Sequence, residues 1–326
     1  MTHRIRGTMH GWRPVLVAAL ALPIAAACGG AGEDDGPALA TAEDAINVDT
    51  DVLWPDGNIA VCWENPTSSN ASDRRAIQEA VEYWWNYRAG FGFHGWQACG
   101  ASEPGVRFIL TDDAIDGSNL PHVKALGRDL RNVVNGIVLP ATYRNHWRTE
   151  CRGSGRLACQ REYAVHELGH VLGFAHEQGR SDTPSSCNEG DSRTSSFETY
   201  GSPWDPQSVM GYCSTPRLGG GQLSGLDVFY SMWAYGTDRD KVYFFEHWSG
   251  DFRTGTNTGW YSGAGCQNVF GHHNDIYSAV MLGRGVAGVR VYQDVGCRGA
   301  SKLFTSAGFL GGDWNDRVSS LEIVSR

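Results

Sequence analysis

The sequence predicts two folded parts: an α+β domain, in which helices pack on a twisted sheet, and then an all-β domain built from Greek-key sheets. At roughly 150 residues per domain, a chain of 326 residues is long enough for two domains with separate cores. Strand-like and helix-like segments alternate over residues 47–240. Residues 241–326 instead show short alternating strands with Gly-rich turns and no helical period.

The composition excludes several classes of protein. With 41% hydrophobic and 19% charged residues, the chain is not largely disordered, and its 12 prolines lack the period of collagen. A net charge of −9 argues against nucleic acid as a partner, because phosphate binding relies on clustered Lys and Arg. We therefore expect a globular protein whose partners are not nucleic acids.

The N-terminus has the pattern of a signal peptide over residues 1–27. Three basic residues, Arg4, Arg6 and Arg13, accompany an apolar run from Val15 to Ala27 that is too short to span a bilayer as a helix. No other stretch reaches about 18 apolar residues, so we expect no transmembrane helix.

The end of this signal, Ala25-Ala26-Ala27-Cys28, resembles the lipobox of bacterial lipoproteins. The resemblance implies lipidation at Cys28, a place in the bacterial cell envelope, and membrane contact only through that anchor. The alternative is ordinary cleavage after the Ala-x-Ala site, which leaves Cys28 as a spare thiol in a secreted extracellular protein. Residues 28–46, rich in Gly, Ala, Asp and Glu, are expected to form a flexible linker.

Nine cysteines are present, and lipidation of Cys28 would leave an even number for disulfides in an oxidising compartment. Up to four disulfides are expected, and buried free thiols are the alternative. Spacing does not give the connectivity, although Cys266 and Cys297 are expected to pair because both lie in the C-terminal domain. The eight candidates are Cys62, Cys99, Cys151, Cys159, Cys187, Cys213, Cys266 and Cys297.

The first part of the α+β domain begins with a predicted strand over residues 53–63, with a turn at Pro55-Asp56-Gly57. A helix is predicted over residues 74–88, with Ser72-Asp73 as its N-cap. Apolar side chains recur along this helix at helical spacing, which predicts that they pack on a sheet as core residues. They are Ile77, Ala80, Val81, Trp84 and Trp85.

Two further strands and a second helix are predicted in the α+β domain. Residues 105–111 and 135–139 are short apolar runs bounded by turn residues. The second helix is predicted over residues 160–172, and it carries the residues with the clearest chemistry.

The segment from His166 to His176 matches H-E-x-x-H-x-x-G-x-x-H at every defined position. On a helix, His166 and His170 stand one turn apart with Cβ atoms about 5–6 Å apart, close enough to share one Zn²⁺. Gly173 tolerates positive φ, so the helix can stop there and the chain can turn back to bring in His176. The pattern therefore predicts three zinc ligands.

Three neutral imidazoles leave an open position for water, which is typical of a catalytic rather than a structural zinc site. Zinc lowers the pKa of that water towards roughly 7, and Glu167 would act as general base and then as general acid towards the leaving amine. Zinc would also polarise the scissile carbonyl. The alternative for the short H-E-x-x-H pattern alone is a chance match on an exposed helix face.

This motif is that of the metzincin metalloproteases, and its extension over residues 173–182 resembles the astacin branch. Residues 208–212 (SVMGY) resemble the Met-turn of that family, with Gly211 in place of the usual His. The resemblance implies a zincin fold over about residues 47–238, closed by a helix within residues 223–236. It makes Met210 the apolar floor beneath the zinc and Tyr212 a switchable ligand or hydrogen-bond donor to the transition state.

The C-terminal part contains an internal repeat. Tyr243-x₄-Trp248-x-Gly250 and Tyr292-x₄-Cys297-x-Gly299 lie 49 residues apart, and an Asn-Asp box follows each, at residues 274–279 and 315–320. Such repeats usually stack to share one core, here as two Greek-key sheets.

The repeat resembles a βγ-crystallin domain, although Cys297 replaces an aromatic residue and Ala279 ends the first box. The resemblance implies calcium binding by oxygen ligands from the boxes, whereas the alternative is that these side chains only cap turns. The candidate ligands are Asn274, Asp275, Ser278, Asn315, Asp316 and Ser319.

Together these patterns predict a zinc-dependent endopeptidase that cuts extracytoplasmic protein or peptide substrates, with a crystallin-like domain that stabilises or docks it. The alternative is a catalytically inactive calcium-binding adhesion or structural surface protein. The presence of Glu167 favours the enzyme. Six further histidines show no ligand spacing, and the adjacent pair among them is expected on a loop surface: His94, His122, His146, His247, His272 and His273.

Overall fold

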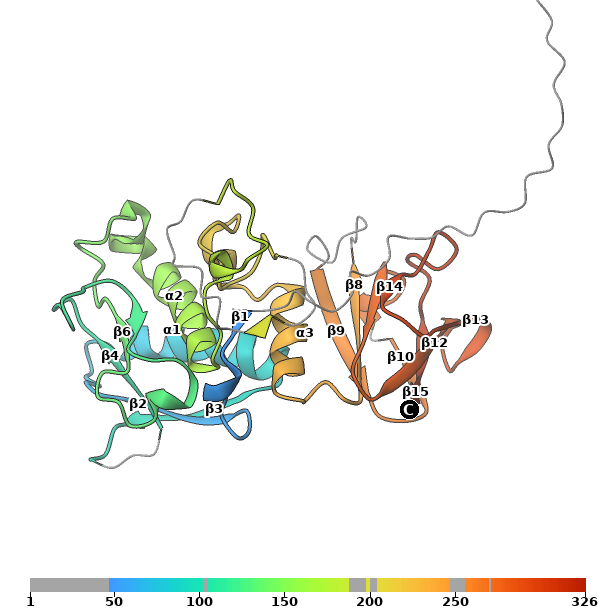
Figure 1. Cartoon of the computed structure of the whole chain (residues 1–326), viewed down its shortest axis with the longest axis horizontal. Coiled ribbons are helices and arrows are strands. Elements are labelled where there is room, and N and C mark those ends of the chain that lie inside the picture. The colour runs from blue at the N-terminus through green and yellow to red at the C-terminus, as the bar shows by residue number, and fades with distance from the viewer. Residues whose placement is uncertain (1–46, 102–104, 188–197, 200–203, 247–255, 270) are drawn as a thin grey trace, which may run out of the picture. The chain divides into compact units, whose positions relative to one another are not determined.

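The computed structural model describes residues 47–101, 105–187, 198–199, 204–246, 256–269 and 271–326 (Figure 1). The predicted signal peptide, Cys28 and the linker lie outside the described residues, as do Trp248, Gly250 and His247. Among the described residues, no helix combines the length and the apolar character needed to cross a membrane.

A five-stranded mixed sheet forms the first part, in the order β3-β2-β4-β6-β5. Its first four strands are parallel, and β5 pairs antiparallel with β6 at one edge. The strands are β2 (Asn58–Trp63), β3 (Gly92–Ala98), β4 (Val106–Leu110), β5 (His122–Val123) and β6 (Ile137–Leu139).

The strand expected from residue 53 begins only at Asn58. The turn before it is closed by the Asn58 amide, which donates to the Asp56 side chain at 2.9 Å. Trp54 lies before the strand, outside the sheet, and donates its indole N–H to the Val171 carbonyl oxygen at 2.8 Å. The strands predicted over residues 105–111 and 135–139 are confirmed as β4 and β6.

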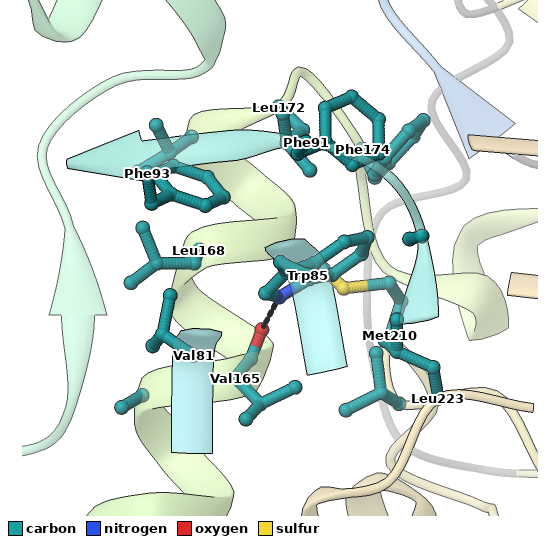
Figure 2. Packing of buried hydrophobic residues seen from close by; sticks show 14 of the residues in the cluster. Val81, Trp85, Phe91, Phe93, Val165, Leu168, Leu172, Phe174, Met210 and Leu223 are labelled. Atoms are coloured by element: carbon teal, nitrogen blue, oxygen red, sulfur yellow. Dashed lines mark hydrogen bonds between the residues drawn. The ribbon is translucent and has the colours of Figure 1, made fainter. Parts of the chain in front are cut away.

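The first helix runs as α1 (Ala71–Val81) and continues as a π-helix over Glu82–Arg88. The predicted N-cap was wrong, because the helix begins after Asn70 and Asp73 lies within its first turn, where it forms an ion pair with Arg156. Trp85 is a core residue, as expected, and donates its indole N–H to the Val165 carbonyl oxygen at 2.9 Å (Figure 2).

The second helix, α2 (Arg156–Val171), begins one turn earlier than predicted and is buried from Tyr163 to its end. Figure 2 shows Val165 and Leu168 of α2 facing side chains from the neighbouring elements, Trp85 and Phe93 among them. The third helix, α3 (Gly225–Ala234), begins with a capping box in which Ser224 and Asp227 bond each other's backbone N–H groups. Because the C-terminal half of α2 is buried in close-packed surroundings, this helix is held rigidly within the core.

Shorter elements complete this part of the chain. A two-stranded sheet pairs β1 (Asn47–Val48) with β7 (Glu198–Thr199). Single turns of 3₁₀ helix cover Thr50–Val52, Gly127–Leu130, Thr149–Cys151, Gly153–Gly155 and Glu177–Gly179.

The C-terminal part consists of two four-stranded antiparallel sheets, in the orders β14-β11-β8-β9 and β10-β15-β12-β13. Each sheet takes three strands from one sequence repeat and its fourth from the other, because β10 joins β15 and β14 joins β11. Residues from both repeats also share one hydrophobic core cluster. The strands are β8 (Lys241–Glu246), β9 (Thr256–Ser262), β10 (Cys266–Asn268), β11 (Ala279–Leu282), β12 (Val286–Asp294), β13 (Arg298–Phe304), β14 (Gly308–Phe309) and β15 (Ser320–Ser325).

All eight cysteines expected in cross-links are paired. The predicted bond between Cys266 and Cys297 is confirmed, and it ties β10 to the turn before β13. Four disulfides in one chain are typical of an exported protein. The other three are Cys62–Cys99, Cys151–Cys159 and Cys187–Cys213.

Candidate metal centre

Three histidines from α2 and the loop after it converge on one point. One ring nitrogen from each of His166, His170 and His176 lies within 4.8 Å of the other two. The Nε2 atoms of His170 and His176 are 3.1 Å apart. Two nitrogens bound to one tetrahedral zinc at about 2.0–2.1 Å would be separated by about 3.3 Å, so the spacing fits a shared metal ion.

Backbone carbonyl groups orient two of these rings. The Nδ1 atom of His166 donates to the Val209 oxygen at 2.8 Å, and that of His170 donates to the Phe174 oxygen at 2.6 Å. A carbonyl oxygen only accepts, so each ring carries its proton on Nδ1 and presents the Nε2 lone pair to the centre. Burial lowers the pKa of His166 well below its usual range, with a further contribution from the other two imidazoles, which favours the neutral form that binds metal.

Gly173 makes the turn that brings in the third histidine, as predicted. It has φ of +90°, and its N–H bonds the His170 oxygen at 2.9 Å as the helix ends. A contact not foreseen from the sequence then holds the returning loop: the Ala175 N–H donates to the Asn47 oxygen, and the Asn47 side chain donates to the His176 oxygen. The N-terminal strand β1 therefore helps to position a ligand.

Glu167 lies beside the three histidines and is 3% exposed. Its Oε2 atom has no hydrogen-bond partner among the described residues, and burial raises the pKa of the carboxyl to about 8. The side chain lines a cavity of about 280 Å³. The cavity is bounded by Pro121, His122, Val123, Leu126, Glu167, His170, Ala175, His176, Gly179 and Tyr212.

Met210 lies directly against α2 at the turn between the two helical ligands. A Cβ atom added to Gly169 would be 2.3 Å from the Met210 sulfur, so only glycine leaves room for it there. Met210 is buried and lies against the turn of α2 that separates His166 from His170.

Tyr212 lines the cavity next to His176, with ring centroids 4.4 Å apart. Its backbone N–H donates to the Gln178 side chain at 3.0 Å. The Arg217 guanidinium lies 4.4 Å from the Tyr212 ring and donates to the Tyr212 carbonyl oxygen at 3.1 Å. Arg217 also lies 5.3 Å from the ring of the exposed Trp147. Tyr212 therefore has contacts with both His176 and Arg217.

A buried network of carboxyl groups supports the Met-turn. Asp227 accepts hydrogen bonds from the Ser208 hydroxyl at 2.7 Å and from the Val209 N–H at 2.8 Å, in addition to capping α3. The carbonyl oxygen of Val209 accepts the hydrogen bond that orients the His166 ring. Asp227 therefore supports His166 indirectly, through Val209.

Glu177 and Asp205 extend this network towards the third ligand. Glu177 accepts from the Asp205 N–H at 2.8 Å and pairs with the buried Arg180 at 3.4 Å. Burial raises the pKa of Glu177 to about 8, and burial together with the neighbouring Asp227 raises that of Asp205 to about 7. Sequence reasoning missed Asp205, because nothing in its spacing links it to Glu177.

The remaining histidines have different environments. His122 lines the cavity, although its spacing did not indicate a role, because β5 brings it to the site from another part of the sequence. His146 is buried beside Tyr143 and Tyr163, and His94 is exposed on β3. The His272-His273 pair lies on a 3₁₀ turn (Gly271–His273).

The two Asn-Asp boxes are related by reciprocal backbone bonds. The Asp275 N–H donates to the Val318 oxygen at 3.4 Å, and the Asp316 N–H donates to the Tyr277 oxygen at 2.9 Å. Both aspartates adopt left-handed backbone, with φ of +59° and +55°. Ser319 donates to Asp275 at 3.3 Å, so side chains from different boxes lie together.

The other candidate calcium ligands lie on the same loops. Asn274 and Asn315 each donate from their side-chain nitrogen to the aspartate that follows. Ser278 is buried, as is Ser319.

Comparison with known proteins gave similarities only among solved structures. No protein-family model matches the sequence, and no curated protein matches it. The chain is similar to myroilysin, with 19% identity over 58% of this chain and 97% of that one and a TM-score of 0.40. It is also similar to a βγ-crystallin domain of Abundant Perithecial Protein from Neurospora crassa in its Ca²⁺-bound form (22% identity, 27% of this chain, 91% of that one, TM-score 0.21). A βγ-crystallin domain from Flavobacterium johnsoniae has 27% identity over 27% of this chain and 97% of that one, with a TM-score of 0.21.

Proposed function

We propose that this protein is a zinc-dependent endopeptidase that hydrolyses peptide bonds of protein or peptide substrates outside the cytoplasm. The observation that carries the proposal is a three-histidine cluster at a cavity whose lining includes two of these histidines, a buried carboxyl group and a phenol. The cluster is His166, His170 and His176, and beside it lie Glu167 and Tyr212.

The donor set suits zinc. Neutral imidazole nitrogen is a preferred zinc ligand, and three protein ligands leave a fourth position for water or substrate. When bound, zinc supplies Lewis acidity, which activates water and polarises a carbonyl group. The Nδ1 bonds of His166 and His170 to backbone oxygens hold both rings in the tautomer that this role requires.

Glu167 supplies the proton transfers. Its Oε2 has no competing partner among the described residues, so it is free to accept a proton from the attacking water. Burial raises the pKa of the carboxyl, which helps the group to hold that proton until it passes to the leaving amine.

Tyr212 is placed to stabilise negative charge. A phenol O–H can donate a hydrogen bond to a developing oxyanion. The contacts of its ring with His176 and Arg217 restrict its motion, so it acts as a preorganised donor.

The test compares the mature protein with Glu167→Gln and with the control Glu79→Gln, whose side chain is exposed on α1. With casein as substrate, Glu167→Gln is expected to lower kcat/KM by about 10²–10⁴-fold at an unchanged zinc content, because only the general base is lost. A zinc chelator should abolish cleavage, and added zinc should restore it.

Equal cleavage by the wild type and Glu167→Gln would contradict the catalytic proposal. A folded, zinc-loaded wild type that cleaves neither casein nor a mixed peptide library would favour the inactive surface protein instead.

A second proposal concerns the C-terminal boxes, which we propose bind Ca²⁺. The reciprocal bonds between them bring Asp275 of one box next to Ser319 of the other, and Ca²⁺ binds such oxygen ligands. Millimolar Ca²⁺ should raise the melting temperature of the wild type, because a ligand that binds only the folded state stabilises it. Mg²⁺ should have less effect, and no shift with Ca²⁺ would contradict the proposal.

We also propose that the protein is exported, which its four disulfides support. Mass spectrometry of the mature N-terminus distinguishes the lipidated Cys28 from an unmodified end.

A further inference from the structure

We propose that His122 is a specificity-determining residue, which contacts the substrate and selects peptides that carry a hydrogen-bond donor side chain near the scissile bond. This inference rests on the proposed peptidase function and adds a substrate preference to it.

The position of His122 comes from the edge strand of the sheet. Strand β5 pairs with β6 through His122 with Val138 and Val123 with Ile137, and no second partner strand of β5 lies among the described residues. His122 and Val123 both line the cavity that contains Glu167 and Tyr212. A peptide in this cavity therefore lies against β5.

A hydrogen bond sets the tautomer of the His122 ring. Its Nδ1 atom is 2.8 Å from the Leu120 carbonyl oxygen, and because that oxygen only accepts, Nδ1 carries the proton. In the neutral ring, Nε2 then has a lone pair and acts as an acceptor. A small tilt of the ring about this bond would present the acceptor to a bound peptide.

The Nε2 atom of His122 has an unmet bonding capacity. It is buried, and no hydrogen-bond partner for it exists among the described residues. A buried polar atom without a partner costs free energy, which a ligand that supplies the missing donor recovers. His122 is also outside the group of three histidines whose ligand atoms lie within 4.8 Å of one another, so a fourth metal ligand does not explain it.

The missing donor is assigned to a substrate side chain because of how strands pair. When a peptide lies along a strand, backbone groups bond backbone groups, and side chains meet the side chains opposite them. The side chain of His122 therefore faces a substrate side chain. Hydroxyl, amide and ammonium groups are donors that fit its lone pair, as in Ser, Thr, Asn, Gln and Lys.

The test uses peptide pairs that differ only in the presence of a donor at one position, Ser against Ala, Thr against Val and Gln against Met. Each position on both sides of the scissile bond is scanned with the wild type, His122→Phe and His122→Gln. The wild type is expected to prefer the donor peptide at one position by at least about tenfold in kcat/KM. His122→Phe should lose that preference, and His122→Gln, which keeps an acceptor, should retain part of it.

His94→Phe is the matched control, because His94 makes the same bond to a carbonyl two residues earlier, to Gly92 at 2.9 Å, but lies outside the cavity lining. It should leave the preference unchanged. Zinc content and melting temperature are measured for every variant, and His122→Ala replaces His122→Phe if the latter loses its fold.

An unaltered preference at every position in His122→Phe would overturn this inference alone. A wild type that cleaves no peptide would overturn the peptidase proposal and this inference with it.

Discussion

The histidine centre and the two Asn-Asp boxes are both candidate metal sites, but different contacts hold them. The histidine rings are fixed by buried bonds to Val209 and Phe174, and the Met-turn behind them depends on the buried Asp227. The boxes hold each other through reciprocal backbone bonds, while Asp275 and Asp316 remain exposed. The comparison indicates that the first site is part of the core, whereas the second is a pair of surface loops aligned by the repeat.

The largest effect is expected for Asp227→Ala. This change leaves the buried N–H group of Val209 and the partly buried N–H group of Ser224 without acceptors, so it should lower the free energy of unfolding by about 3–5 kcal/mol. Urea unfolding measures the loss, and metal analysis should show weaker zinc retention.

The corresponding change in the Asn-Asp boxes is Asp316→Asn. Asparagine tolerates the left-handed backbone conformation that Asp316 adopts. Because Asp316 is exposed, this change should cost less than about 1 kcal/mol without calcium. Similar losses in the two variants would remove the distinction between the sites.

A smaller effect is expected for Gly169→Ala. The new Cβ would lie 2.3 Å from the Met210 sulfur, and the resulting displacement should cost about 1–3 kcal/mol and reduce peptidase activity. Thermal unfolding and casein cleavage measure both.

The control for this change is Gly312→Ala, where an added Cβ meets nothing within 4 Å and stability should change by less than about 0.5 kcal/mol. A Met210→Ala change in the Gly169→Ala background should recover part of the activity if the clash is the cause. No recovery would assign the loss to the helix itself.

The last effect depends on pH and concerns Asp205. Its pKa is raised to about 7 in the folded protein, whereas an unfolded Asp titrates near about 3.9. Between these values the native state holds a proton that the unfolded state has lost, so this group lowers the free energy of unfolding as pH rises from about 4 to about 7.

Asp205→Asn does not titrate and provides the reference. The stability of the wild type relative to this variant should therefore fall by at most about 4 kcal/mol from pH 4 to pH 7 and then level off. Urea unfolding at several pH values measures it, and a constant difference across the range would show that Asp205 stays ionised.

Local spacing predicted much of this protein. The helical period set His166 and His170 on one face of α2, and Gly173 predicted the turn that returns His176. Two apolar runs predicted β4 and β6, and the shared C-terminal location of Cys266 and Cys297 predicted their disulfide. The predicted N-cap of α1 was wrong: Ser72-Asp73 also fits the cap pattern, but the helix begins after Asn70, and Asp73 pairs instead with Arg156 of α2.

By itself, the sequence determined the features that depend on neighbouring residues: the ligand motif, the helix that carries it, and the repeat with its boxes. Only the tertiary structure decided which distant groups meet. It brought Asn47 to the ligand loop, Asp205 to Glu177, His122 to the cavity and β10 to the other repeat. The physical reason is that backbone geometry fixes distances within a few turns, whereas contacts between distant segments depend on how the whole chain buries its apolar surface.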